Sequence, residues 1–185
     1  MRIALFGVPC VGKTTVGQIV ADRLGYAFVD FDHEVIARMG TTILGLKDAC
    51  LTETRYRRTV KPILEQILDE HLTDLVLAMP PSGLFREYKR VFNHHPDIVT
   101  VWLKDKAKNI FDRLIFTDDD DNLIVEPVVT SDNAWHYRME VKDNIAYYRD
   151  TLRQAQVKLR INGRGAQQAA DVLIELLRGL AGWAD

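Results

Sequence analysis

The sequence predicts an α/β protein of three layers, in which helices cover both faces of a central parallel sheet. Short apolar runs alternate with amphipathic stretches along most of the 185 residues, a pattern that is typical of parallel strands joined by helices. A glycine-rich turn directly follows the first apolar run, at the point where a strand would pass into a helix. This length suits one core, and no linker or repeat divides it, so we expect one domain over residues 1–185.

Five strands are expected where the apolar runs are short, at residues 2–6, 27–30, 75–79, 98–103 and 157–161. A helical pattern of apolar residues follows each of these five strands. The helices are expected at 14–24, from about 32, at 83–93, at 106–116 and at 166–180. Residues 52–71 form a further long helical pattern. Pro62 lies inside that pattern, so we expect either a kinked helix or a join between two helices there.

The glycine-rich turn reads GVPCVGKT over residues 7–14 and matches the phosphate-loop pattern G-x-x-x-x-G-K-[ST] at every specified position. Gly7 and Gly12 allow backbone geometry that lets successive N–H groups point at phosphate oxygens, and the start of the next helix adds its positive dipole end. Lys13 can reach the β- and γ-phosphates, the Thr14 hydroxyl can hold Mg²⁺, and Thr15 has a lesser place near the α-phosphate.

The loop therefore predicts a phosphate-loop NTPase fold that uses ATP and Mg²⁺. The residues expected to contact the nucleotide here are Gly7, Pro9, Cys10, Val11, Gly12, Lys13, Thr14 and Thr15. The loop does not identify an acceptor, because motors, switches and kinases share it.

Asp30 and Asp32 stand at the end of the second expected strand, where ligands bind in open parallel sheets. Strand alternation would send both side chains to the same side. One carboxylate could support the Mg²⁺ shell, while the other accepts a hydrogen bond from a substrate hydroxyl and helps to remove its proton. Alternatively, Asp32 caps the helix that follows.

The stretch TDDDDNLIVEPVV at 117–129 interrupts the α/β rhythm between two helical segments. A run of four aspartates is most often a solvated loop. The alternative is a lid, at about 116–130, that closes over a ligand.

The composition excludes several other classes of protein. With a net charge of -2, the chain does not resemble a general nucleic-acid binder, and no run reaches the length of a membrane span. The two cysteines, Cys10 and Cys50, suit a reducing cytoplasm, since a disulfide at Cys10 would obstruct the loop.

The first third of the chain, GVPCVGKTTVGQIVADRLGYAFVDFDHEVIARMGTTI, resembles the start of a shikimate kinase, a small phosphate-loop enzyme. The similarity continues in YRR at 56–58, YYRDTL at 147–152 and LRINGRGAQQAADVLIELL at 159–177. The resemblance implies that ATP phosphorylates a hydroxyl of shikimate, a small carboxylated polyol, and that the protein is a monomer.

Carried over residue by residue, the resemblance implies that Lys13 and Asp32 are catalytic, with Asp32 as the base, and that Thr14 and Asp30 serve the metal. It also implies that Arg57 and Arg149 hold the shikimate carboxylate, as guanidinium forks can. Arg113 would stack on adenine, and the adenine loop would include Arg164.

Three departures from the family fall on the acceptor side. Pro80 and Pro81 stand where the family has a glycine run whose N–H groups approach shikimate, and prolines supply no N–H. Glu126 stands where the family's lid carries an arginine that meets the transferred phosphate, and Val60 replaces a family glutamate.

Three functions consequently stay open. The first is ATP-dependent phosphorylation of a small carboxylated polyol, with shikimate as the leading candidate. The second is phosphorylation of another small metabolite or nucleoside. The third is a regulatory role in which nucleotide binds and little kinase chemistry follows.

Overall fold

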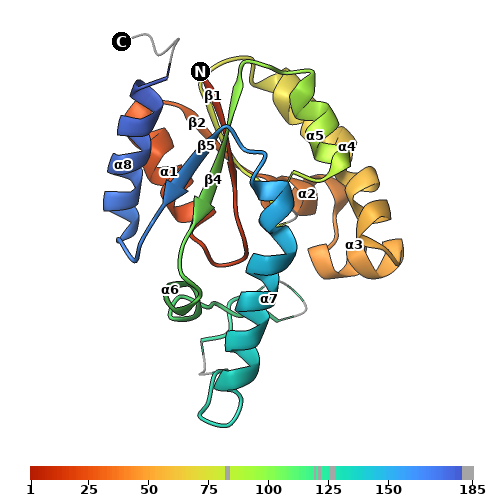
Figure 1. Cartoon of the computed structure of the whole chain (residues 1–185). Helices are drawn as coiled ribbons and strands as arrows, with labels where there is room; N and C mark the ends of the chain where they lie inside the picture. The colour runs from red at the N-terminus through yellow and green to blue at the C-terminus, as the bar shows by residue number, and fades with distance from the viewer. Residues whose placement is uncertain (82–83, 119, 121, 126–127, 181–185) are drawn as a thin grey trace.

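The computed structural model describes residues 1–81, 84–118, 120, 122–125 and 128–180. In this part of the chain a central sheet has five strands, all parallel, in the order β2-β3-β1-β4-β5 (Figure 1). The strands are β1 (Arg2–Phe6), β2 (Ala27–Asp30), β3 (Leu75–Ala78), β4 (Ile98–Lys104) and β5 (Val157–Arg160). The predicted sheet is confirmed.

Helices lie on both sides of this sheet. On one side α1 (Lys13–Leu24) packs against α8 (Ala166–Arg178), while α4 (Glu53–Glu70), α5 (Arg86–Asn93) and α7 (Ala134–Leu152) lie on the other (Figure 1). The shorter helices are α2 (Phe31–Met39), α3 (Ile43–Cys50) and α6 (Ala107–Phe111). The three-layer α/β/α prediction is therefore confirmed. None of the helices in the described ranges is long and apolar enough to cross a membrane.

Burial along the strands follows their place in the sheet. Every residue of β1 and β3 is buried, as expected for central strands that are covered on both faces. In the edge strand β5, Val157 and Leu159 are buried, whereas Lys158 and Arg160 are exposed. One face of the sheet is thus left partly open beside β5.

Helix α4 runs without a break through Pro62, so the predicted join between two helices is wrong. The Thr52 hydroxyl caps the helix by accepting a hydrogen bond from the Arg55 N–H. Buried side chains continue on both sides of the proline, from Tyr56 to Leu68. This apolar contact with the core holds the helix together although the proline removes one backbone hydrogen bond.

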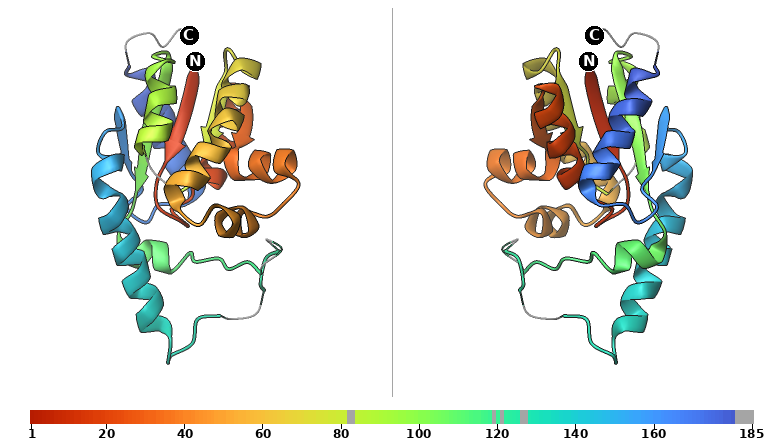
Figure 2. Two further views of the ribbon diagram at one scale, coloured as in Figure 1. Left: turned by 90° about the vertical axis from the view of Figure 1, so that its right-hand side faces the viewer. Right: turned by 90° about the vertical axis from the view of Figure 1, so that its left-hand side faces the viewer.

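The carboxyl ends of the strands meet at one edge of the sheet. The phosphate loop follows β1, Asp30 ends β2, Pro80 closely follows β3, and Asp105 follows β4. The chain between α6 and α7 forms an arm beneath this edge (Figure 2). The fold therefore brings the phosphate loop, Asp30 and Pro80 to the same edge of the sheet.

Candidate active site

The phosphate loop has the tight backbone that its glycines permit. Gly12 adopts a φ of 102° directly before α1, a conformation that favours glycine. Gly7 is needed for space: a Cβ built there would lie 2.8 Å from the Leu103 carbonyl oxygen and 2.7 Å from the Val11 side chain. Cys10 also has a positive φ, of 56°, although it is not a glycine.

This close approach predicts that Gly7→Ala lowers the free energy of unfolding by about 1–3 kcal/mol, because the backbone of β4 must shift. Gly165→Ala is the matched control, since a Cβ there meets nothing within 4 Å and φ is -64°. The control should change stability by less than about 1 kcal/mol. Urea unfolding of the two variants measures the difference, and equal losses would contradict the steric explanation.

Lys13 begins α1 and folds back over the loop. Its ammonium donates hydrogen bonds to the carbonyls of Gly7 and Val8, each at 3.1 Å. Burial lowers the pKa of Lys13 to about 8, against the opposing attraction of Asp32 and Asp30. A desolvated ammonium beside the loop amides is suited to phosphate binding.

The other loop residues take distinct places. Pro9 and Cys10 line a small cavity beside Tyr137 of α7, Val11 has a buried side chain, and Thr15 is exposed on α1. Because its side chain is buried, Val11 can contact a phosphate only through its backbone.

Asp30 joins the phosphate loop to α2. Its Oδ2 accepts a hydrogen bond of 2.7 Å from the Thr14 hydroxyl, and its Oδ1 accepts one of 3.1 Å from the Asp32 N–H. Asp30 is therefore the N-cap of α2, whereas the alternative at the sequence level gave that role to Asp32. The two residues expected at the metal, Thr14 and Asp30, lie in direct contact.

Asp32 lies in the first turn of α2 and is partly buried. Its Oδ1 is buried and has no hydrogen-bond partner among the described residues. Burial first, and then the neighbouring Asp30 carboxylate, raise the pKa of Asp32 to about 6, although Lys13 and Lys47 oppose the shift. A buried carboxylate with a free oxygen and a pKa near neutrality can accept a proton from a bound hydroxyl.

Asp30 and Asp32 line one cavity of about 420 Å³ with Thr14. Residues from α3, α4, α7 and the arm between α6 and α7 complete it. The polar and charged members include His33, Lys47, Glu53, Tyr56, Thr117 and Tyr148, and the apolar members include Ile36, Ile43, Pro80, Pro81 and Ile115. We call this cavity the acceptor pocket. The two prolines border it, so they provide no N–H groups on that wall.

Arg57 does not line the acceptor pocket. Its side chain is buried, stacks 4.3 Å from the Phe85 ring centre, and forms ion pairs with Glu53 at 3.4 Å and Glu87 at 3.7 Å. Because Glu53 lines the pocket, Arg57 lies one layer behind the wall. The same two carboxylates hold it in place.

Arg149, which the resemblance places at the acceptor carboxylate, is not among the residues that line the acceptor pocket. It lines a separate cavity with Trp102 and Lys104 of β4. Tyr148, the preceding residue of α7, lines the acceptor pocket instead, because successive helical residues point about 100° apart. Arg149 therefore faces β4 in this structure, and its role at the acceptor carboxylate stays a prediction.

The residues expected at adenine meet around Asp105. Its carboxylate accepts hydrogen bonds from Arg113 at 2.7 Å, from Asn109 at 2.7 Å and from the Gly163 N–H at 3.2 Å. Desolvation alone would raise the pKa of Asp105, but hydrogen bonds from Asn109, the Lys106 N–H and Arg113 outweigh it, so the pKa is lowered. Arg164 bonds the carbonyls of Arg160 and Ile161. Asp105 thus ties Arg113 to the predicted adenine loop.

The arm between α6 and α7 covers residues 112–133, a longer span than the predicted lid. Thr117 pairs with Leu123 in an antiparallel bridge, and Asp118 Oδ1 accepts hydrogen bonds from the N–H groups of Asp120 and Asn122. At least one member of the aspartate run therefore stabilises a turn. Glu126, which the sequence places at the family's lid arginine, lies outside the described residues.

Sequence reasoning missed Lys47, Glu53, Tyr148 and Asp105 and assigned Tyr56 no function. Asp105 directly follows β4. The rule that ligands bind at the carboxyl ends of parallel strands therefore applies to Asp105 as it does to Asp30. The first three lie on helices whose contact with the pocket depends on tertiary packing, and no local pattern marks them. Tyr56 is buried, and its hydroxyl has no hydrogen-bond partner among the described residues.

Comparisons with known proteins identify the family to which this chain belongs. The family model described as shikimate kinase matches residues 9–178. The chain is 26% identical over 178 residues to the shikimate kinase of Bacillus licheniformis, covering 96% of this chain and 93% of that protein. It is 25% identical over 179 residues to that of Persephonella marina, covering 96% and 99%.

Solved structures show the same fold. A shikimate kinase from Bacteroides thetaiotaomicron matches with a TM-score of 0.76 at 22% identity, covering 96% of this chain and 98% of the other. The shikimate kinase from Acinetobacter baumannii, solved in complex with shikimate, matches with a TM-score of 0.73 at 24% identity, covering 95% and 92%. With a family match over most of its length, the chain belongs to the shikimate kinase family.

Proposed function

We propose that this chain is a single-domain kinase that transfers the γ-phosphate of ATP to a hydroxyl group of shikimate. The observation that carries the proposal is the acceptor pocket, where the unpartnered oxygen of Asp32 lies beside the Thr14–Asp30 contact of the phosphate loop. A hydroxyl bound at Asp32 would consequently lie close to the terminal phosphate of a nucleotide in the loop.

The transfer is an in-line attack of the acceptor oxygen on the γ-phosphorus. Asp32 accepts the hydroxyl proton as the new P–O bond forms and the bond to the β-phosphate oxygen breaks. Lys13 and the loop amides stabilise the negative charge on the transferred group and on the leaving ADP. The lid at about 116–130 would exclude water, whose attack would hydrolyse ATP without phosphorylating the acceptor.

Thr14 and Asp30 suit a magnesium ion, since Mg²⁺ prefers oxygen ligands and keeps several waters and phosphate oxygens in its shell. The Thr14 hydroxyl would contact it directly and Asp30 through water. Bound Mg²⁺ would neutralise charge on the β- and γ-phosphates.

Lys47 and Tyr56 are the residues we assign to acceptor recognition. The Lys47 ammonium lies 3.3 Å from Glu53 and 5.6 Å from the Tyr56 ring centre, so it can swing to an acceptor carboxylate. Burial raises the pKa of the Tyr56 phenol, which therefore stays protonated and can donate a hydrogen bond. Arg57, which lies behind the pocket wall, would fix the position of the Glu53 side chain through their ion pair.

Turnover should have a bell-shaped pH dependence. The rate kcat/KM rises as Asp32 loses its proton near its pKa of about 6, and falls as Lys13 loses its positive charge near its pKa of about 8. Initial rates at constant ionic strength measure both limbs. A profile that stays flat from about pH 5 to about pH 9, with neither limb, would contradict the assigned roles.

The proposed function is tested by ADP release with shikimate, quinate, gluconate, nucleosides and nucleoside monophosphates as acceptors. Strong stimulation by shikimate is the expected result. Stimulation by another acceptor alone would move the chain to a different substrate, a result that Pro80 and Pro81 in the pocket wall would help to explain. Nucleotide binding without stimulation by any acceptor would favour the regulatory role.

A further inference from the structure

A second large cavity lies outside the acceptor pocket, between α7 and the open face of β4 and β5. Its volume is about 480 Å³, within the usual range for small-molecule sites. The floor is apolar and includes Trp102, Ile145 and Leu152. Trp102 is only 8% exposed. We call this the α7–β4 cavity.

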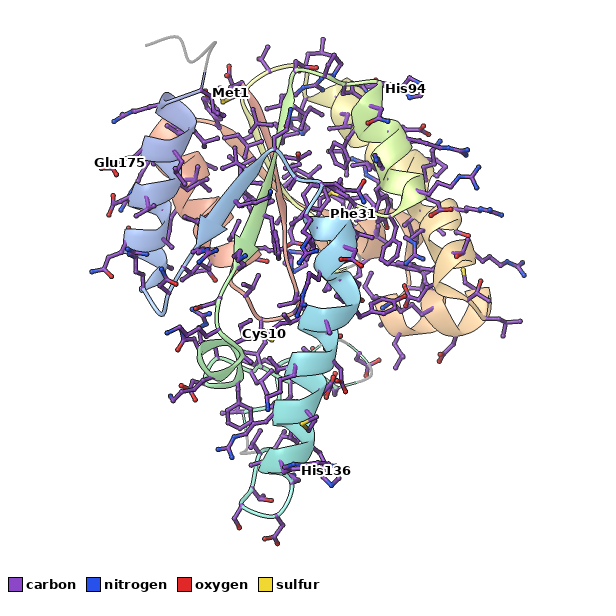
Figure 3. The ribbon with its side chains drawn as sticks, viewed as in Figure 1. Met1, Cys10, Phe31, His94, His136 and Glu175 are labelled. Atoms are coloured by element: carbon purple, nitrogen blue, oxygen red, sulfur yellow. The ribbon has the colours of Figure 1, made fainter. Side chains whose placement is uncertain are left out.

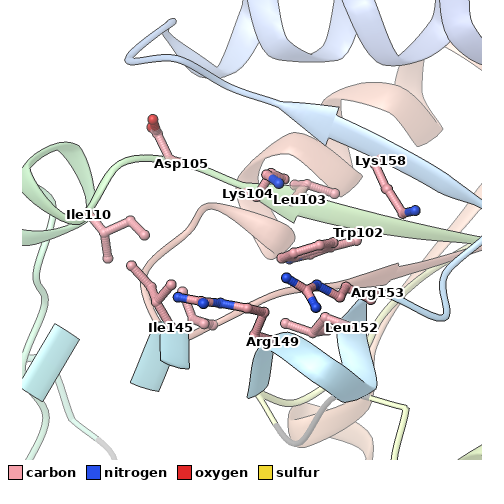
Figure 4. Close-up of a pocket in the computed structure, with 11 residues that line it drawn as sticks. Trp102, Leu103, Lys104, Asp105, Ile110, Ile145, Arg149, Leu152, Arg153 and Lys158 are labelled. Atoms are coloured by element: carbon pink, nitrogen blue, oxygen red, sulfur yellow. The ribbon is translucent and has the colours of Figure 1, made fainter. Parts of the chain in front are cut away.

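Four cationic side chains surround this floor. Lys104 and Lys158 come from the strands, Arg149 comes from α7, and Arg153 is the C-cap of that helix (Figure 4). The register explains the strand contribution, since Trp102 pairs with Lys158 in neighbouring parallel strands and both side chains face α7. The two arginines are four residues apart, which puts them on the same face of the helix.

These cations have few anionic partners. In the described part of the chain, no carboxylate forms an ion pair with Lys104, Arg149 or Lys158, and Arg153 has only a 3.5 Å contact with the exposed Asp150. Among the described residues that line the cavity, Asp105 is the only acid, and its carboxylate points away from the basic group and binds Arg113 and the Gly163 N–H (Figure 4). The cavity therefore has an excess of positive charge.

Mutual repulsion is evident at Lys104. Its ammonium lies 4.4 Å from the Trp102 ring centre. Its pKa is lowered, first by desolvation and then by the neighbouring Arg160, Lys158, Arg153 and Arg149. An anion placed among these groups would relieve the repulsion, so it would bind more tightly than to isolated surface lysines.

We propose that the α7–β4 cavity is a second ligand site, which binds a small organic dianion such as a phosphate monoester on an aromatic or cyclic body. Two guanidinium groups and two ammonium groups match more than one negative charge, and the apolar floor beside Trp102 matches the ring. The cavity also includes Val8 of the phosphate loop, and Tyr148, next to Arg149, lines the acceptor pocket. Its occupant would thus contact elements that build the active site.

The test is isothermal titration calorimetry with phenyl phosphate at constant ionic strength, in the presence of saturating Mg·ADP to occupy the phosphate loop. We expect wild-type binding that is at least about tenfold tighter than in the Arg153→Gln/Lys158→Gln variant. The control variant, Arg55→Gln/Arg178→Gln, loses the same charge at two exposed helical positions and should bind like wild type. Unchanged ADP affinity in both variants verifies that they fold.

Inorganic phosphate and benzoate serve as further probes. Both should bind more weakly than phenyl phosphate, because the first lacks the ring and the second lacks the second charge. The proposal is overturned if phenyl phosphate does not bind while ADP is present, if both double variants weaken binding equally, or if inorganic phosphate binds as tightly.

Discussion

Asp32→Asn is expected to lower kcat by about 10²–10⁴-fold, the usual contribution of a positioned general base. The substitution keeps the shape of the side chain but removes the group that accepts the hydroxyl proton. The unpartnered Oδ1 of Asp32 and the pKa of about 6 are the observations behind this expectation. Steady-state rates with saturating ATP and acceptor measure it.

The same substitution should stabilise the fold. Because the pKa of Asp32 is raised from its ordinary 3.8 to about 6, ionising it costs the folded state more than the unfolded state. The penalty is fully present above about pH 6 and disappears as the pH falls to about 4. Asp32→Asn should therefore raise the free energy of unfolding near pH 7 by about 1–3 kcal/mol.

Urea unfolding at a series of pH values measures this gain, which should shrink in acid. A destabilised Asp32→Asn variant with normal turnover would contradict both the catalytic and the electrostatic assignment. A catalytic residue that costs stability is a common compromise in enzymes.

Lys13→Ala is expected to lower kcat/KM by at least about 10³-fold, because it removes the one loop side chain that can carry positive charge to the γ-phosphate. The fold should persist, since the Lys13 ammonium bonds only to carbonyls of its own loop. Activity assays and thermal unfolding together separate the two effects.

Lys108→Ala is the matched control for this substitution. Lys108 is 81% exposed on α6, and its ion pair is an exposed one with Asp112, so its loss should leave the rate unchanged. Normal turnover in Lys13→Ala would eliminate the phosphate-loop mechanism. Loss of activity in both variants would indicate a general effect of charge.

The nucleotide side of the site could be predicted from the sequence because its geometry is local. The phosphate loop, the strand before it and the helix after it are contiguous, so spacing alone relates Gly7, Lys13 and Thr14. Asp30 and Asp32 were found for a similar reason, since a strand end in a parallel sheet marks the ligand edge. The structure adds that Asp30 caps α2 while it accepts from Thr14.

The acceptor side could not be predicted as well because it is assembled from distant helices. A turn of about 100° per residue decides whether Tyr148 or Arg149 faces the pocket, and the sequence does not fix this rotation. Lys47 enters the pocket through the packing of α3 on α4, which no local pattern reveals. Figure 3 shows side chains that project from these helices in several directions.

Charged residues and two prolines define the wall of the acceptor pocket and the layer behind it. Glu53 and Glu87 hold Arg57 behind the wall, and Pro80 and Pro81 border the cavity. We expect the acceptor's carboxylate to bind on the side of Lys47 and its reacting hydroxyl on the side of Asp32. We infer that the sequence departures concern how the acceptor is held, while Lys13, Thr14, Asp30 and Asp32 make the contacts on which the proposed phosphate transfer depends.

Phosphorus NMR of the complete reaction tests the central claim most directly. With ATP, Mg²⁺ and shikimate, we predict a new phosphate monoester resonance that grows in step with ADP, and no such resonance in Asp32→Asn over the same interval. Formation of ADP and inorganic phosphate alone, with no phosphate monoester in the wild-type reaction, would contradict the assignment of this chain as a shikimate-phosphorylating enzyme.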